Sequence, residues 1–159
     1  MNRLKSKIRK HFINSFGWRT NRKIVVIESD DWGSERIPSK KTLNALKKEG
    51  INVEQCHYMM NDSLASHQDL SHLYEVLSKY KDFKGNNPII TANTLVANPD
   101  LNKIKNDNFQ RYHFEHFTHT LSKYPQHNNS FNLWLEGINK GLFFPQSHGR
   151  EHLNISRWM

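Results

Sequence analysis

Four consecutive β-branched residues, Ile-Val-Val-Ile at 24–27, are followed closely by the acidic string Ser29-Asp30-Asp31-Trp32-Gly33. Side chains branched at Cβ favour strands, and an unbroken apolar run is typical of a strand buried on both faces of a parallel sheet. The pattern therefore predicts a buried strand from which Asp30 and Asp31 emerge at the carboxyl end. Ligands of α/β proteins bind at that end of the strands, so the two aspartates are candidate functional residues.

The rest of the chain alternates between helical and strand patterns. Helices are predicted where apolar residues recur at helical spacing between capping residues, turns and glycines, and strands where β-branched and apolar residues are consecutive. The predicted helices cover residues 39–50, 69–80, 112–124 and 128–141, and the predicted strands cover 24–27, 89–96 and 142–144. Residues 102–110 are predicted to form a polar loop. This order of elements indicates an α/β fold with mostly parallel strands and flanking helices.

Length and charge together predict one domain preceded by a separate segment. A chain of 159 residues can bury one hydrophobic core of ordinary size. The formal net charge is +8, but residues 1–23 contain eight basic and no acidic residues, so the remaining chain carries equal numbers of both. We therefore divide the chain into a basic segment, residues 1–21, and an α/β domain, residues 22–159. Because the domain itself is neutral, we expect no nucleic-acid partner.

The basic segment has the pattern of an amphipathic helix. Its apolar residues recur at helical spacing among the basic ones and are Leu4, Ile8, Phe12, Ile13 and Phe16. Such a helix can pack its apolar stripe on the domain while its lysines stay in water. It can instead lie on an anionic lipid surface or bind another polyanion.

The sequence also bears on location. It has no apolar stretch of the roughly 18 residues that a membrane-spanning helix needs, and residues 1–23 lack the continuous apolar core of a secretory signal. The single cysteine, Cys56, cannot form an internal disulfide, which agrees with a reducing compartment. We expect a cytoplasmic protein with no transmembrane segment, whose contact with a membrane surface, if any, is weak and made through residues 1–23.

A second string, His148-Gly149-Arg150-Glu151-His152, supplies two imidazoles four positions apart. Two imidazoles and one carboxylate, with a position left open for water, suit Zn²⁺ or a similar divalent ion. The adjacent aspartates offer that carboxylate and a second one for proton transfer. On a helical turn the two rings would project from one side, whereas in a loop the spacing guarantees nothing. The alternative is that the aspartates only cap or solvate a turn and that the histidine spacing is coincidental.

Together the two strings resemble the first two motifs of the polysaccharide deacetylase family. The first motif ends a strand with a small polar or aromatic residue, two aspartates and a glycine, and is similar to Ser29-Asp30-Asp31 with Gly33. The second is a histidine, a hydroxyl residue, two variable positions and a histidine, and is similar to residues 148–152. Trp32 is inserted in the first motif and Gly149 replaces the hydroxyl residue, so the chain resembles a divergent member.

The resemblance implies a fold, a reaction and residue roles. The family's catalytic domain is a distorted (β/α) barrel, of which this chain would hold an incomplete part without the C-terminal strands. Asp30 would be the general base, and Asp31, His148 and His152 would bind one divalent metal ion, best matched by Zn²⁺. The reaction would remove an N- or O-acetyl group from a sugar or polysaccharide, as in surface-polysaccharide metabolism, so the expected partner is an acetylated carbohydrate. The family's general acid and base-orienting arginine belong to later motifs, which we expect beyond Met159 because the chain looks cut short.

Four further residues are candidates for orienting the ligands or contacting the substrate. Arg150 and Glu151 stand between the two histidines and would orient them from outside the metal centre, or would face solvent. Asn93 and Asn98 lie at the end of the strand predicted at 89–96. They would contact sugar hydroxyls, or would satisfy backbone groups in a turn.

Two other functions stay open. The string from His148 to His152 also fits the inverted zinc-peptidase pattern, in which Glu151 would be the base; that pattern requires a helix, which Gly149 disfavours. Alternatively, the chain is a truncated remnant that binds metal or carbohydrate without turnover.

Overall fold

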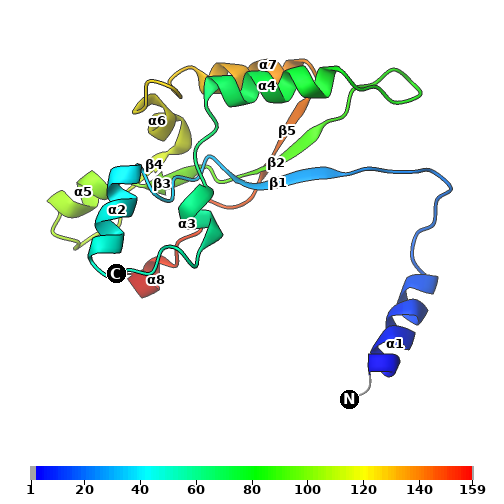
Figure 1. Cartoon of the computed structure of the whole chain (residues 1–159), viewed down its shortest axis with the longest axis horizontal. Coiled ribbons are helices and arrows are strands. Elements are labelled where there is room, and N and C mark those ends of the chain that lie inside the picture. The colour runs from blue at the N-terminus through cyan, green and yellow to red at the C-terminus, as the bar shows by residue number, and fades with distance from the viewer. Residues whose placement is uncertain (1–2, 159) are drawn as a thin grey trace.

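The structure is a computed structural model that describes residues 3–158 (Figure 1). In chain order the elements are α1 (Arg3–Ser15), β1 (Ile27–Trp32), α2 (Lys40–Lys48), α3 (His57–Asn61), α4 (His67–Ser78), β2 (Ile90–Thr94), β3 (Ala97–Pro99), α5 (Leu101–Asn106), β4 (Phe114–His116), α6 (Phe117–Ser122), α7 (Ser130–Asn139), β5 (Phe143–Ser147) and α8 (Ile155–Trp158). The elements from β1 onward form one α/β body, and α1 stands apart from it at the end of an extended segment (Figure 1).

Three parallel strands form the main sheet in the order β1-β2-β5. Ile90 of the central strand β2 lies opposite Ile27 of β1 on one side and opposite Phe143 of β5 on the other. A separate antiparallel pair joins β3 to β4. The prediction of an α/β fold with mostly parallel strands and flanking helices is thus confirmed. Within residues 3–158 the sheet is open, with β1 and β5 as its edges, and no closed barrel is formed.

The hydrophobic core lies between the sheet and the helices α4 and α7, which run side by side over one of its faces (Figure 1). Tyr74 of α4 and Trp134 of α7 pack with Phe143 of β5, and both aromatic rings meet the Phe143 ring edge-on. Gly137 of α7 makes the close approach of the two helices possible, because a Cβ at this position would lie 2.3 Å from the Tyr74 hydroxyl. The helices therefore bury the same face of the sheet as a single layer.

The first strand lies later in the chain than predicted. The β-branched run at 24–27 contributes only Ile27 to β1, and Val25 is 86% exposed, so the prediction of a buried strand there is wrong. The pairing of β1 with β2 starts at Ile27 opposite Ile90, and the residues before it have no neighbouring strand. As a result Asp30 and Asp31 lie within β1 near its carboxyl end instead of following it.

The chain between β2 and α7 also departs from expectation. The predicted polar loop at 102–110 contains α5, which Asp100 caps by accepting a hydrogen bond from the Lys103 backbone N–H at 3.0 Å. The helix predicted at 112–124 is a short strand, β4, followed by α6. Pairing with β3 holds β4 extended, and this tertiary contact overrides the helical spacing of the apolar residues.

The remaining predicted helices are confirmed with small shifts. Ser39 caps α2, and its hydroxyl oxygen accepts a hydrogen bond from the Thr42 N–H at 3.1 Å. Helix α4 starts before the predicted cap, because Ser66 is its N-cap and Asp69 is the third helical residue of a capping box. The reciprocal bonds between Ser66 and Asp69 satisfy two backbone N–H groups that would otherwise lack partners.

The basic segment forms a helix as predicted, but it is not packed on the body. The side chains described in α1 are all exposed, including those of the apolar stripe. In residues 3–158 there is no helix with both the length and the apolar character required to cross a bilayer.

Candidate metal centre

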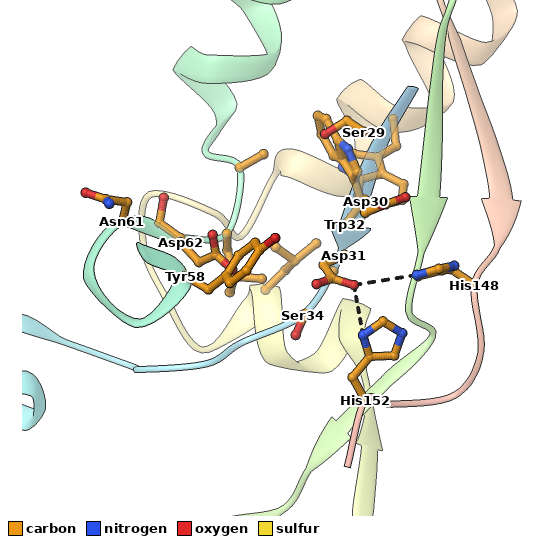
Figure 2. Close-up of a pocket in the computed structure, with 16 residues that line it drawn as sticks. Ser29, Asp30, Asp31, Trp32, Ser34, Tyr58, Asn61, Asp62, His148 and His152 are labelled. Carbon is orange, nitrogen blue, oxygen red and sulfur yellow. Dashed lines mark ion pairs between the residues drawn. The ribbon is translucent and has the colours of Figure 1, made fainter. Parts of the chain in front are cut away.

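Three potential metal ligands meet at the carboxyl end of the sheet. Asp31 comes from β1, and His148 and His152 come from the segment after β5, so the ligands approach from the two edges of the sheet (Figure 2). The Asp31 Oδ1 atom lies 3.1 Å from Nδ1 of His152 and 3.8 Å from Nε2 of His148. One ligand atom from each residue lies within 4.8 Å of the others. Among residues 3–158 these three form the one such group of His, Cys, Asp or Glu side chains.

Backbone contacts explain how the two histidines reach Asp31. The His148 N–H donates to the Thr94 carbonyl at 2.9 Å, which fixes the start of the segment after β5 against β2. Gly149 has φ +105°, a conformation that favours glycine, and its carbonyl accepts a hydrogen bond from the Val96 N–H at 3.3 Å. The Ala97 N–H then donates to the Arg150 carbonyl at 2.9 Å. Residues 148–154 are not helical, so the convergence of the rings depends on these contacts and not on helical spacing.

Asp31 has two features typical of a residue held for function. Its backbone has φ +62°, which is uncommon for a residue other than glycine, and it lies where the pairing of β1 with β2 is irregular. Its Oδ1 atom is buried and has no hydrogen-bond partner, although it faces both imidazoles. A buried carboxylate oxygen without a partner costs free energy, and a cation between it and the two rings would remove that cost.

Two of the three separations between the potential ligand atoms are near those around a tetrahedral divalent ion. Atoms bound at 2.0–2.1 Å to a tetrahedral Zn²⁺ lie roughly 3.3 Å from one another. The separations of 3.1 and 3.8 Å between Asp31 Oδ1 and the two imidazole nitrogens are close to that value. One carboxylate and two imidazoles are also the donor types that Zn²⁺ accepts, and three protein ligands leave one position for water or substrate.

Gly33 and Asn98 fix the chain just after Asp31. Gly33 has φ +83°, and a Cβ there would lie 2.7 Å from the Leu95 carbonyl oxygen, so only glycine fits. The Asn98 side chain is buried, donates to the Gly33 carbonyl at 2.8 Å and accepts from the Glu35 N–H at 2.8 Å. Of the two alternatives for Asn98, the structure favours the backbone role over contact with a sugar.

Arg36 and Asp62 belong to the site but were not predicted from the sequence. The Arg36 guanidinium forms an ion pair with Oδ2 of Asp31, and its Nε atom lies 2.7 Å from Asp62 Oδ2. Tyr58 of α3 packs against it, with the guanidinium carbon 5.0 Å from the ring centroid. Burial alone would lower the pKa of Arg36, but the hydrogen bonds and charges of Asp62 and Asp31 outweigh it and raise the pKa above its ordinary value. Arg36 therefore holds the second oxygen of Asp31 and leaves Oδ1 for the histidines.

A pocket with a volume of about 610 Å³ opens beside the three ligands (Figure 2). Its lining mixes aromatic, apolar and polar side chains and includes Trp32, Trp134, Tyr58, Leu64, Leu121, Ser29, Ser34, Asn61 and Asp62 as well as Asp30, Asp31 and the two histidines. Asp30 lies at the pocket one residue before the ligand Asp31, and its Oδ1 atom accepts a hydrogen bond from Asn93 Nδ2 at 2.7 Å. Asn93 thus contacts the predicted base directly.

Arg150 and Glu151 lie apart from the pocket. They pair with each other, with Arg150 Nη2 at 2.6 Å from Glu151 Oε1, and neither lines the pocket. The Arg150 guanidinium lies over the Phe114 ring at 4.8 Å from its centroid. Neither side chain forms a hydrogen bond or ion pair with His148 or His152, so the structure does not support their expected role in orienting the histidines.

Comparison of the chain with protein-family models, with curated proteins and with solved structures gives no match.

Proposed function

We propose that this chain is a metal-dependent hydrolase that removes acetyl groups from a carbohydrate. The observation that carries the proposal is the grouping of His148 and His152 around a buried Asp31 carboxylate oxygen that has no hydrogen-bond partner, beside a pocket that Asp30 also lines. The resemblance of the same residues to the two deacetylase motifs supplies the reaction class.

In this proposal each residue near the ligands has one task. Asp31, His148 and His152 would hold a divalent ion. When bound, such an ion supplies a Lewis acid for an acyl oxygen and lowers the pKa of a water molecule. Asp30 accepts the proton of the attacking water, and the hydrogen bond from Asn93 keeps its carboxylate oriented. Attack of the water oxygen on the acetyl carbon breaks the bond from that carbon to the sugar nitrogen or oxygen, which takes up a proton from solvent, so that acetate and the free amine or hydroxyl are released.

The pocket suits a sugar better than an extended peptide. Its volume of about 610 Å³ lies within the range of small-molecule sites. Aromatic rings such as Trp32 and Tyr58 can cover the apolar CH faces of a sugar, while Ser34 and Asn61 can bond its hydroxyls.

The alternative zinc-peptidase function is less consistent with the geometry. It needs Glu151 as a base beside two histidines on one helix. Residues 148–152 are not helical, and Glu151 is paired with Arg150 outside the pocket. A remnant that binds metal or carbohydrate without turnover stays as the second candidate, because the proposed mechanism has no side chain that acts as the acid for the leaving group.

The test combines metal content with acetate release. The full chain is loaded in turn with Zn²⁺, Co²⁺ or Mn²⁺ and incubated with N-acetylated and O-acetylated oligosaccharides, and free acetate is measured. We expect about one equivalent of tightly bound ion, acetate release, and a loss of activity of about 100-fold or more in Asp30→Asn with metal content unchanged. The double variant His148→Ala/His152→Ala should lose both the bound ion and the acetate release.

The matched control changes two exposed histidines elsewhere, His72→Ala/His116→Ala, and should keep both properties. Bound metal without acetate from any acetylated sugar would leave the non-catalytic binding function. Metal content that is the same in His148→Ala/His152→Ala and in the control would contradict the metal centre itself.

A further inference from the structure

Helix α1 carries an apolar stripe that nothing in the described structure covers. Leu4, Ile8 and Phe12 follow one another at intervals of four residues, and Phe16 continues the row just after the helix. These side chains are 60–79% exposed, and the Phe12 and Phe16 rings lie 5.2 Å apart, edge to face. Trp18, two residues further, is 79% exposed. Protein surfaces seldom expose a continuous group of such large apolar side chains to water.

The same segment is strongly basic. Residues 4–23 contain seven Lys or Arg residues and no acidic residue. Within residues 4–158 none of these seven side chains forms an ion pair with a carboxylate, and Lys7 and Lys10 lie away from the apolar row on the helix. Positive charge on one side and apolar side chains on the other are the two requirements of a helix that lies in the headgroup region of an anionic bilayer.

Other possible partners of the apolar stripe fit it less well than a bilayer does. The body does not cover it, since α1 stands apart at the end of the extended segment before β1 (Figure 1). A second α1 would bring two sets of like charges together over a helix of 13 residues, which is short for a stable pair. Nucleic acid would use the positive charge but leave Leu4, Ile8 and Phe12 in water.

We propose that residues 4–23 bind the surface of an anionic phospholipid bilayer, with α1 lying in the plane of the headgroups and its apolar row turned into the acyl region. Lys5 and Arg9 flank the row and reach back to the phosphates, and Trp18 sits at the boundary between headgroups and acyl chains. The proposal does not depend on the hydrolase function, because α1 precedes β1 and stands apart from the body that holds the candidate metal ligands (Figure 1).

The test compares two variants that add the same charge to different sides of α1. The full chain is sedimented with vesicles of phosphatidylcholine and phosphatidylglycerol in equal parts, and with vesicles of phosphatidylcholine alone. We expect binding to the mixed vesicles only, accompanied by a blue shift of Trp18 fluorescence that Trp18→Phe removes. Ile8→Glu/Phe12→Glu should weaken binding at least about tenfold more than Ser6→Glu/Asn14→Glu, because only the first pair places charge in the acyl region.

Duplex DNA and single-stranded RNA are titrated in parallel. The proposal would be overturned if the two double variants weakened vesicle binding equally, or if the full chain did not bind vesicles. Tighter binding to nucleic acid than to the mixed vesicles would also overturn it. Thermal unfolding of the body should be the same in all variants, which distinguishes a loss of membrane binding from a loss of folding. Metal content is measured on the same samples and should not follow vesicle binding, so this proposal and the hydrolase function can fail separately.

Discussion

At the scale of single residues, Asp31 combines a left-handed backbone with a carboxylate that has one oxygen paired to Arg36 and the other without a hydrogen-bond partner. Asparagine adopts positive φ more readily than other residues with a side chain, so Asp31→Asn tests the charge without adding backbone strain. We expect affinity for Zn²⁺ to fall about 100-fold or more, since even the outer partners of metal ligands are worth 10–100-fold. Titration calorimetry of the metal-free protein measures this.

The same variant should leave folding nearly intact. The Asp31–Arg36 pair is partly exposed, and Arg36 keeps Asp62 as a partner, so the free energy of unfolding without metal should change by no more than about 1 kcal/mol. Unchanged zinc affinity in Asp31→Asn would show that Asp31 is not a ligand. Asp31→Ala is the poorer test, because it mixes loss of the ligand with strain at φ +62°.

Some site residues can be predicted from the sequence and others cannot, depending on whether a sequence pattern or only a tertiary contact places them in the site. The resemblance of the two strings to the deacetylase motifs predicts Asp31, His148 and His152 as metal ligands, and the structure brings these three side chains together. Arg36 and Asp62 could not be found in this way, because their pairing depends on where the loop after α3 lies, and no sequence pattern encodes that contact. Asn98 has the right position near a strand end, but burial decides that it serves the backbone of the Gly33 turn.

At the scale of elements, the sequence pattern predicts helices well, because the hydrogen bonds and caps of a helix join residues that are close together in the chain. Helices α2 and α4 have side-chain caps, all three of α2, α4 and α7 have apolar residues at helical spacing, and the sequence predicts each of them. The run at 24–27 has the composition of a strand, yet β1 begins only where β2 offers a partner. Likewise α6 and β4 divide a stretch with helical spacing, because β3 lies beside its first part. Strand limits are set by neighbours that are distant in sequence, so they are the least predictable from the chain alone.

The contact between α4 and α7 gives a prediction at this scale. In Gly137→Ala the new Cβ would lie 2.3 Å from the Tyr74 hydroxyl and 2.4 Å from the ring carbon that carries it, so the helices must move apart. Alanine favours a helix over glycine by about 1 kcal/mol, but overpacking costs typically 1–3 kcal/mol. We expect a net loss of roughly 1 kcal/mol in the free energy of unfolding by urea. Asn139→Ala, at an exposed position of the same helix, should cost nothing, and a Gly137→Ala protein as stable as this control would contradict the packing.

At the scale of the whole molecule, the candidate metal ligands come from the two edges of an open sheet. Asp31 belongs to β1 and the two histidines follow β5, and in the sheet each of these edge strands pairs only with β2, so an ion held by all three side chains would tie the two edges together. A ligand that binds only the folded chain stabilises it by about 4 kcal/mol at a thousandfold excess over its dissociation constant. For a chain of this size that corresponds to a rise in Tm of roughly 8–16 °C.

We therefore expect Zn²⁺ to raise the Tm of the chelator-treated protein by that amount and a chelator to reverse the rise. The rise should disappear in His148→Ala/His152→Ala and persist in His72→Ala/His116→Ala, as followed by circular dichroism during heating. A Zn²⁺-dependent rise of the same size in both double variants would place the stabilising ion elsewhere. Because Asp30→Asn keeps all three ligands, its Tm should respond to Zn²⁺ like that of the unchanged chain, which separates the stabilising role of the centre from its role in hydrolysis.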